Sequence, residues 1–330
     1  MSKTKATAVV FPRANACEMV QYEPPALDAG ELLVRTEYSG VSQGTEIWAY
    51  TGHRPELQFP TVPGYQTVGV VEQVGEGVEG FAVGQRVLWH ASRLPAQWPA
   101  TWMAGHVSLA VVPVKHDPPP RVIPNEVDPV AASLAALAAV SLRGIDMLDI
   151  RPGDLAVVTG QGLIGQASAQ LARLRGATVI ATDLSAKRLQ LSKAHSADLV
   201  ANPRDGDLKQ LVTSLRPNGA DLVIDTTGRS EAFAECVALL RWEGQFLMQG
   251  WYPKPITFDF HATHMKKPKI AITCGIGDTD RTLELMRYGK LDWRPLVTDL
   301  VPVGDAPAIY QKLAANDPDT LGVVFDWKGI

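Results

Sequence analysis

The sequence has 330 residues, 46% hydrophobic and 20% charged, which is enough apolar material for packed cores and too little charge for a disordered chain. Its length predicts about two domains. The formal net charge is −4 and the charges are scattered, so we expect a small-molecule substrate, with no nucleic acid and no membrane surface as partner.

The first part of the chain, to about residue 122, has the texture of antiparallel β structure. Short alternating or β-branched runs are separated by Gly, Pro and Asn residues. The expected strands are Ala6–Phe11, Glu31–Tyr38, Thr67–Val74, Gln85–Trp89 and Val107–Val114. A stiff connector, Pro118–Pro120, follows them.

From about residue 128 the texture changes to helices that alternate with short apolar strands. The expected helices are Asp128–Met147, Gln166–Arg175, Ser185–His195 and Glu231–Arg241. The expected strands are Leu155–Thr159, Thr178–Thr182, Asp221–Asp225 and Gln245–Gln249. This alternation predicts an α/β fold with a doubly wound parallel sheet.

The cysteines indicate a reducing setting. Cys17, Cys236 and Cys274 are an odd number at wide spacings, which excludes a disulfide framework and a structural zinc site of four thiolates. The N-terminus has no apolar run typical of a signal peptide, and the longest run of low polarity, Val130–Leu142, is shorter than the roughly 20 residues of a membrane span. We therefore expect a cytoplasmic protein.

A glycine loop between the first of these strands and its helix predicts a dinucleotide site. In the segment Gly160-Gln-Gly-Leu163-Ile164-Gly165, Gly160 permits a tight turn, Gly162 lets the backbone approach a pyrophosphate, and Gly165 lets helix and strand pack closely. The helix N-terminus would then bind the pyrophosphate. The alternative is a tight turn with no ligand.

The residue at the end of the second strand favours NAD over NADP. Asp183 lies 18 residues after Gly165, where a carboxylate accepts hydrogen bonds from the ribose of NAD and repels the 2′-phosphate of NADP. Lys187 and Arg188 follow one turn later. These basic side chains either weaken the preference for NAD over NADP, with Arg188 contacting the cofactor, or form a solvated helix face.

Three front segments together with the glycine loop resemble the medium-chain dehydrogenase/reductase superfamily. The segments are Gly40–Glu46 (GVSQGTE), Val62–Gly69 (VPGYQTVG) and Gly75–Val87 (GEGVEGFAVGQRV). The resemblance covers nearly the whole chain and implies a GroES-like catalytic domain of residues 1–128 and 274–330 around a Rossmann domain of residues 129–273. The first two segments look most like the bacteriochlorophyllide a dehydrogenase branch.

The positions that match the zinc ligands of this superfamily carry other residues. Where zinc members have Cys, His and a Cys or Glu, this sequence has Ser42, Tyr65 and either Ala135 or Ala136. None of these supplies the thiolate, imidazole or carboxylate that zinc requires. His261 and His264 have no third ligand near them in sequence. We expect a zinc-independent member.

Without a metal, other preorganised polar groups must polarise a carbonyl oxygen or take up a hydroxyl proton. The candidates for this catalytic role are Ser42, Thr45, Glu46, Tyr65 and Gln66, and Thr45 matches the proton-relay hydroxyl of zinc members. A Tyr65 phenol would donate a hydrogen bond, or act as acid and base if its pKa were lowered. The alternative is that Ser42 and Tyr65 only pack in the vacated metal pocket.

Further residues are expected near the cofactor from their places after the strands. They are Thr226, Gly250 and Cys274, the last within a segment expected to present backbone amides to the nicotinamide carboxamide. Trp251 and Tyr252, with Trp48, are candidates for the wall of an aromatic substrate pocket, although plain packing is the simpler reading of each.

These features lead to one main hypothesis and two alternatives. The main one is a zinc-independent, NAD-dependent alcohol dehydrogenase that transfers a hydride between nicotinamide and a secondary alcohol or ketone. The alternatives are a zinc-free quinone or enone reductase, which would usually prefer NADPH, and a redox-silent dinucleotide-binding protein. By analogy with relatives we expect a homodimer or homotetramer that pairs the sheet edge near Ile270–Thr273.

Overall fold

The computed structural model describes residues 5–99, 101, 103–315, 317 and 319–330. Contacts divide the chain into two units, unit 1 (Met1–Ala136 and Val297–Ile330) and unit 2 (Leu137–Leu296). Unit 1 is therefore built from both ends of the chain. The boundaries differ from the expected ones: residues 129–136 belong to unit 1 and residues 274–296 to unit 2.

Unit 1 is mainly antiparallel β structure. Its strands are β1 (Ala6–Val10), β2 (Glu18–Tyr22), β3 (Glu31–Gly40), β4 (Thr67–Val74), β5 (Arg86–Trp89), β6 (Leu109–Pro113), β7 (Arg121–Val122), β14 (Val297–Pro302) and β15 (Gly322–Asp326). Its helices are α1 (Gln43–Tyr50), α2 (Pro129–Ala132), α3 (Ala135–Ile145), which continues into unit 2, and α10 (Ala306–Ala314), preceded by the short turn η3 (Val303–Asp305). The main sheet has the order β14-β15-β3-β4-β5-β7, with β6 also on β3, while β1 and β2 form a separate pair.

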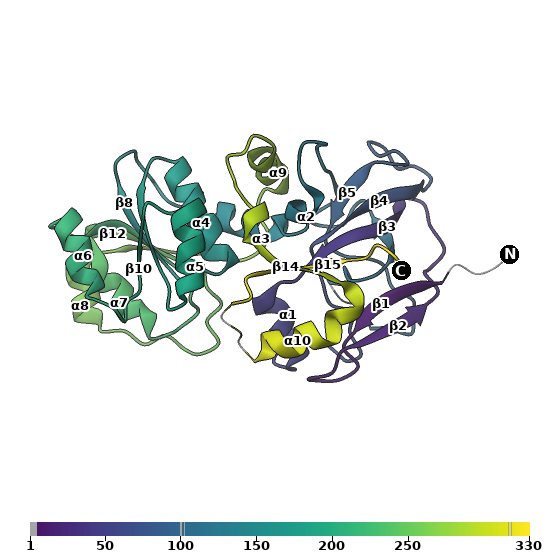
Figure 1. Ribbon diagram of the computed structural model, residues 1–330, viewed down its shortest axis with the longest axis horizontal. Helices are drawn as coiled ribbons and strands as arrows, with labels where there is room; N and C mark the ends of the chain where they lie inside the picture. The colour runs from purple at the N-terminus through teal and green to yellow at the C-terminus, as the bar shows by residue number, and fades with distance from the viewer. Residues whose placement is uncertain (1–4, 100, 102, 316, 318) are drawn as a thin grey trace. The chain divides into compact units, whose positions relative to one another are not determined.

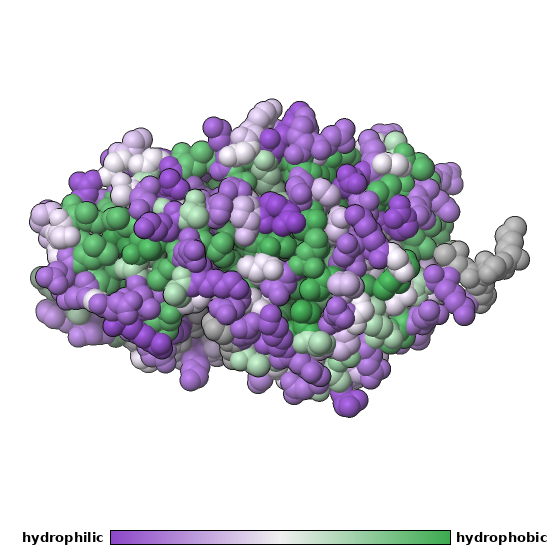
Figure 2. Space-filling model, in the orientation of Figure 1, coloured by the Kyte–Doolittle hydropathy of each residue, from purple (hydrophilic) through white to green (hydrophobic). Residues whose placement is uncertain are grey.

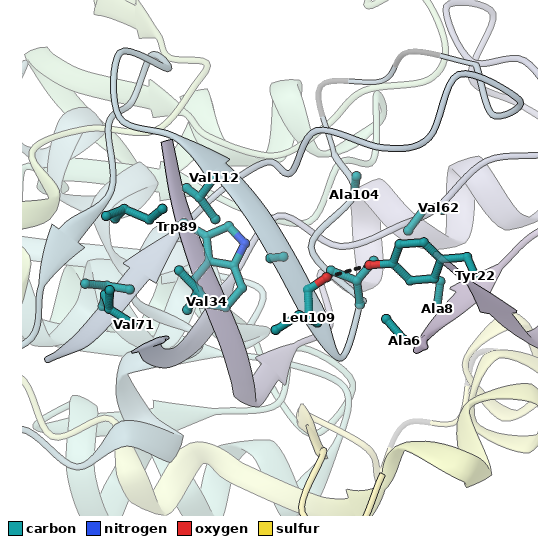
Figure 3. Close-up of a cluster of buried hydrophobic side chains, with 14 of the residues drawn as sticks. Ala6, Ala8, Tyr22, Val34, Val62, Val71, Trp89, Ala104, Leu109 and Val112 are labelled. Carbon is teal, nitrogen blue, oxygen red and sulfur yellow. Dashed lines mark hydrogen bonds between the residues drawn. The ribbon is translucent and has the colours of Figure 1, made fainter. Parts of the chain in front are cut away.

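The core of unit 1 fills the space between these strands. Figure 3 shows the wholly buried Trp89 ring among side chains that include Val34 and Val112. The same view shows the Tyr22 hydroxyl donating to the Leu109 carbonyl at 2.6 Å, which satisfies a phenol that burial would otherwise penalise. This core anchors β3, β4 and β5 to one another through Val34, Val71 and Trp89.

Unit 2 is a parallel sheet with helices on both faces, as the sequence predicts. Its strands are β8 (Leu155–Thr159), β9 (Thr178–Thr182), β10 (Leu199–Ala201), β11 (Ala220–Asp225), β12 (Leu240–Met248) and β13 (Lys269–Ile272). Its helices are α4 (Leu163–Leu174), α5 (Ala186–Leu191), the π-helical η1 (Ser192–Ser196), α6 (Leu208–Leu215), α7 (Ala232–Leu239), α8 (Phe260–Lys266), α9 (Thr279–Arg287) and the short turn η2 (Arg294–Leu296). The strand order is β10-β9-β8-β11-β12-β13. The chain adds strands outward from β8 on one side and then from β11 on the other, which is the Rossmann arrangement. In Figure 1, α4 and α5 lie on one face of this sheet and α6 and α7 on the other.

One predicted helix is broken in two. The sequence predicts a continuous helix over 128–147, but α2 ends at Ala132 and α3 begins at Ala135. The Ser133 hydroxyl donates to the Val130 carbonyl at 2.8 Å, and the Leu134 amide bonds three residues back, to Ala131. Because the serine side chain competes for the carbonyl that the next turn needs, the helix stops there.

Apolar side chains also reach the surface. Figure 2 shows them grouped on the visible face of unit 2. No helix in the described part of the chain has the length and apolarity that crossing a bilayer requires.

Candidate active site

The glycine loop of unit 2 has the geometry that a dinucleotide needs. Gly160 has φ +82°, and a Cβ on Gly165 would lie 1.9 Å from the Gly160 carbonyl oxygen. Gly162 caps the N-terminus of α4, and a Cβ built on it would meet nothing within 4 Å. The loop is thus tight where helix and strand pack and open at the helix N-terminus, where a pyrophosphate would bind. Leu163 and Ile164 form the first turn of α4.

Asp183 is fixed at the end of β9 by backbone amides. One carboxylate oxygen accepts from the Gln161 amide at 2.6 Å and the other from the Ser185 amide at 2.8 Å. The Arg188 guanidinium lies 4.0 Å from the same carboxylate. These bonds join the glycine loop to the residue that would contact the adenosine ribose, so a bound dinucleotide would meet a prepared carboxylate.

Thr226 is bonded to the glycine loop. Its hydroxyl donates to the carbonyl oxygens of Thr159 at 3.0 Å and Gly160 at 2.9 Å, so it supports the glycine loop from below. Gly250 lies in the loop after β12, and Cys274 is exposed after β13. The candidate cofactor residues therefore all lie in unit 2, around the carboxyl ends of its strands.

In unit 1, the Tyr65 phenol donates to the Ser42 hydroxyl at 2.7 Å. We call these two residues the hydroxyl pair. Both are buried, and Ser42 caps α1 without using its side chain for the cap. Burial raises the pKa of the Tyr65 phenol, and hydrogen bonds with Ser42 and Thr45 only partly oppose this. The phenol is therefore a donor at neutral pH, and its pKa is raised rather than lowered.

Glu46 is the centre of a buried hydrogen-bond cluster. Its carboxylate accepts from the Ser42 amide at 2.8 Å, from His106 Nε2 at 3.0 Å and from the Tyr310 hydroxyl at 2.5 Å. We call Glu46 with these three donors the Glu46 hub. His106 Nδ1 faces the Ser39 hydroxyl at 2.8 Å. The Glu46, His106 and Tyr310 side chains have no exposed surface, and burial raises the pKa of the Tyr310 phenol well above its usual value. With these bonds, Glu46 holds the Ser42 backbone in place.

The other two candidates of unit 1 lie next to the hydroxyl pair. Thr45 is half-buried in the first turn of α1. Gln66 is wholly buried beside Tyr65, and its backbone carbonyl accepts from the Gly40 amide at 2.7 Å. Thus the five residues predicted from the sequence do come together in unit 1, with Glu46 as their anchor.

Two family models match the chain. The model described as alcohol dehydrogenase GroES-like domain matches residues 28–110, and the model described as zinc-binding dehydrogenase matches residues 164–288. The chain belongs to the zinc-type alcohol dehydrogenase-like superfamily of medium-chain dehydrogenases/reductases. This confirms the family and the fold class expected from the sequence.

Curated relatives and solved structures of the superfamily match over nearly the full length. A sorbitol dehydrogenase of Halalkalibacterium halodurans is 28% identical over 320 residues, covering 90% of this chain and 93% of the relative. The 2-desacetyl-2-hydroxyethyl bacteriochlorophyllide A dehydrogenase of Cereibacter sphaeroides is 27% identical over 338 residues, covering 98% and 99%. A dehydrogenase of Sinorhizobium meliloti 1021, solved bound to NADP, superposes with a TM-score of 0.86 at 21% identity, covering 98% and 99%.

The donor set of this medium-chain dehydrogenase/reductase does not fit zinc. Ser42 and Tyr65 present neutral hydroxyls that are bonded to each other, and Ala135 and Ala136 present buried methyl groups. Zinc in proteins is held by thiolate, imidazole and carboxylate. Among the described residues, no group of three or more His, Cys, Asp or Glu side chains could hold a metal ion.

Sequence reasoning missed the partners of Glu46. His106 stands in no motif, and Tyr310 is 264 residues away from Glu46 in the chain. Sequence reasoning also passed over His90. Its Nδ1 donates to the Tyr65 carbonyl at 2.9 Å, while its buried Nε2 has no hydrogen-bond partner among the residues that the structure describes. Burial lowers the pKa of His90 to about 4. No local pattern signals these side chains, because each is defined by contacts across the fold.

Proposed function

We propose that this chain is an NAD-dependent alcohol dehydrogenase that interconverts a secondary alcohol and its ketone without a metal. The observation that carries the proposal is the hydroxyl pair, a buried Tyr65 phenol donating to Ser42 at the positions matching two zinc ligands. The names of the relatives favour a polyhydroxylated or bulky substrate. The three free cysteines suit a reducing setting such as the cytoplasm.

In the proposed mechanism, unit 1 supplies the hydrogen-bond donors for the substrate oxygen. NAD, when bound, supplies the acceptor of the hydride. Tyr65 directs its own hydrogen to the Ser42 oxygen, so the Ser42 hydroxyl hydrogen is the one that meets the oxygen of a ketone. The Glu46 hub fixes the backbone of Ser42 and thereby the direction of this donor. In the oxidation direction the Ser42 oxygen would accept the alcohol proton while Ser42 passes its own proton to Tyr65, Tyr65 passes its own to Thr45, and the half-buried Thr45 hydroxyl releases one to solvent water.

The preference for NAD over NADP rests on Asp183. Its carboxylate is held on both oxygens by backbone amides and is mostly buried, so it cannot turn away from a 2′-phosphate. The Asp183 carboxylate and a 2′-phosphate placed against it in a partly desolvated site would repel each other. One similar structure was solved bound to NADP and another with NADH. Arg188 at 4.0 Å is the group through which this chain would tolerate NADP.

The experiment is to follow NADH absorbance with chelator-treated protein, NAD and a panel of secondary alcohols that includes polyols and bulky aromatic carbinols. NADH formation undiminished by the chelator supports the proposal, and the reacting alcohols define the substrate size. Loss of activity on chelation, restored by zinc, would overturn the metal-free mechanism. Binding of NADH with enones but no alcohols as substrates would favour the reductase alternative.

We also propose that the chain forms a homodimer through β13. This strand lies at the edge of the parallel sheet, and its Ile270 and Ile272 are exposed. None of the residues of α8, just before it, is buried, and Phe260 and Met265 are exposed there. An apolar unpaired edge of this kind is covered by antiparallel pairing with a second copy.

Light scattering tests the dimer. The wild-type chain should have twice the mass of one chain, and Ile272→Lys should shift it to one. A wild-type mass of one chain would refute the proposed pairing.

A further inference from the structure

A wholly buried carboxylate at the carboxyl end of β11 joins three segments of unit 2. Asp225 Oδ1 accepts from the Thr159 hydroxyl at 2.7 Å and from the Thr227 hydroxyl at 2.8 Å and amide at 3.1 Å. Its Oδ2 accepts from the Tyr252 hydroxyl at 2.5 Å. Thr159 ends β8, Thr227 follows β11 and Tyr252 follows β12. One side chain thus binds the ends of three neighbouring strands.

The backbone of the same segments is packed as closely as glycine allows. The Asp225 carbonyl accepts from the amides of Gln249 at 2.8 Å and Gly250 at 3.1 Å. A Cβ on Gly228 would lie 2.3 Å from the Trp251 carbonyl oxygen, and one on Gly250 would lie 2.5 Å from the Gly228 amide nitrogen. Segments 226–228 and 249–252 therefore pack directly against each other, and the bond between Asp225 and Tyr252 links them through side chains.

The Tyr252 phenol remains protonated in this setting. Burial raises its pKa, and the negative charge of Asp225 raises it further. Burial also raises the pKa of the neighbouring Cys236 thiol, so this thiol is not a competing reactive group. The carboxylate is a fixed acceptor surrounded by donors, which is an arrangement that rigidifies its surroundings.

We propose that Asp225 and Tyr252 are positioning residues that hold segments 226–228 and 249–252 for the nicotinamide half of the dinucleotide. This inference rests on the dinucleotide site of the proposed function. In a doubly wound sheet, each half of the dinucleotide is bound by one half of the sheet. The glycine loop and Asp183 belong to the half formed by β8, β9 and β10, and the Asp225 cluster serves the half formed by β11, β12 and β13.

The test compares Tyr252→Phe with Tyr288→Phe, which removes an exposed phenol of the same unit as a matched control. Calorimetry measures the binding of NADH and of ADP, which lacks the nicotinamide half. For Tyr252→Phe we expect NADH binding to weaken roughly tenfold, the range for a lost hydrogen bond to a charged group, and ADP binding to stay unchanged. Asp225→Asn should act in the same direction.

A second measurement needs no nucleotide. Hydrogen exchange of the free chain should speed up in segments 226–228 and 249–252 of Tyr252→Phe and stay unchanged at 160–165. Unchanged NADH binding, or equal weakening of NADH and ADP, would overturn the inference while leaving the proposed function standing. A wild-type chain that binds neither nucleotide would overturn both.

Discussion

Replacing Glu46 by Gln tests whether the Glu46 hub holds the hydroxyl pair. The carboxylate accepts from three donors, the Ser42 amide, His106 Nε2 and the Tyr310 hydroxyl. A glutamine side chain has one accepting oxygen, and its NH₂ group would face at least one of these donors. One buried donor left unsatisfied costs about 1–3 kcal/mol, and the loss of the charge from the remaining bonds adds to it, so we expect unfolding free energy to fall by about 3 kcal/mol.

The assay is equilibrium urea unfolding followed by tryptophan fluorescence. Trp327 reports locally, because its indole N–H donates to the Ser39 hydroxyl that also faces His106. Glu72→Gln is the control, since this exposed carboxylate pairs only with Arg35 among the ion pairs described and should change stability by less than about 0.5 kcal/mol. ADP binding should be unchanged, because the proposed dinucleotide site lies in unit 2. If the unfolding free energy of Glu46→Gln lies within about 0.5 kcal/mol of that of the control, the Glu46 hub does not stabilise unit 1 as proposed.

Three further changes follow from the same geometry. Tyr65→Phe should lower kcat/KM for alcohol oxidation by roughly 100-fold, with unchanged NADH binding. In the wild type, the oxidation rate should keep rising at alkaline pH, because burial raises the pKa of the Tyr65 phenol that passes on the proton. A rate that reaches its plateau by neutral pH would contradict this. Asp183→Ser should raise the KM for NAD and lower that for NADP, measured by NADPH formation, and an unaltered preference would remove Asp183 from the specificity argument. Burial lowers the pKa of His90 to about 4, below its unfolded value of about 6.5, so the unfolded chain binds a proton first as the pH falls. The free energy of unfolding should therefore decrease by about 2 kcal/mol from pH 7 to pH 5. In His90→Gln, urea unfolding should show a smaller decrease over this range, and an equally large one would exclude His90 as its source.

The glycine loop could be predicted because its signals are local. Gly160, Gly162 and Gly165 act within six residues, and Asp183 follows at the end of the next strand, so spacing alone defines their parts. The parallel order of the strands followed from alternation of strand and helix in the same way.

The helix that carries Glu46 was not predicted. α1 has eight residues, begins beside a glycine and lacks a side-chain cap, so local propensity says little about it. Its stability comes from contacts distant in sequence, such as the bond from Tyr310 and that from Tyr65 to Ser42. The break after Ala132 was likewise invisible, because a single serine hydroxyl decides it.

The construction of unit 1 from both ends of the chain sets an order for folding during synthesis. Glu46 and α1 leave the ribosome early, but Tyr310 and strand β15 emerge only after the whole of unit 2. Unit 2 is contiguous and can complete its sheet first, while the Glu46 carboxylate stays hydrated until the last residues arrive. A chain that stops at Leu296 would thus retain a nucleotide-binding unit yet be unable to bury Glu46, so such fragments would be open to proteolysis at residues 43–50.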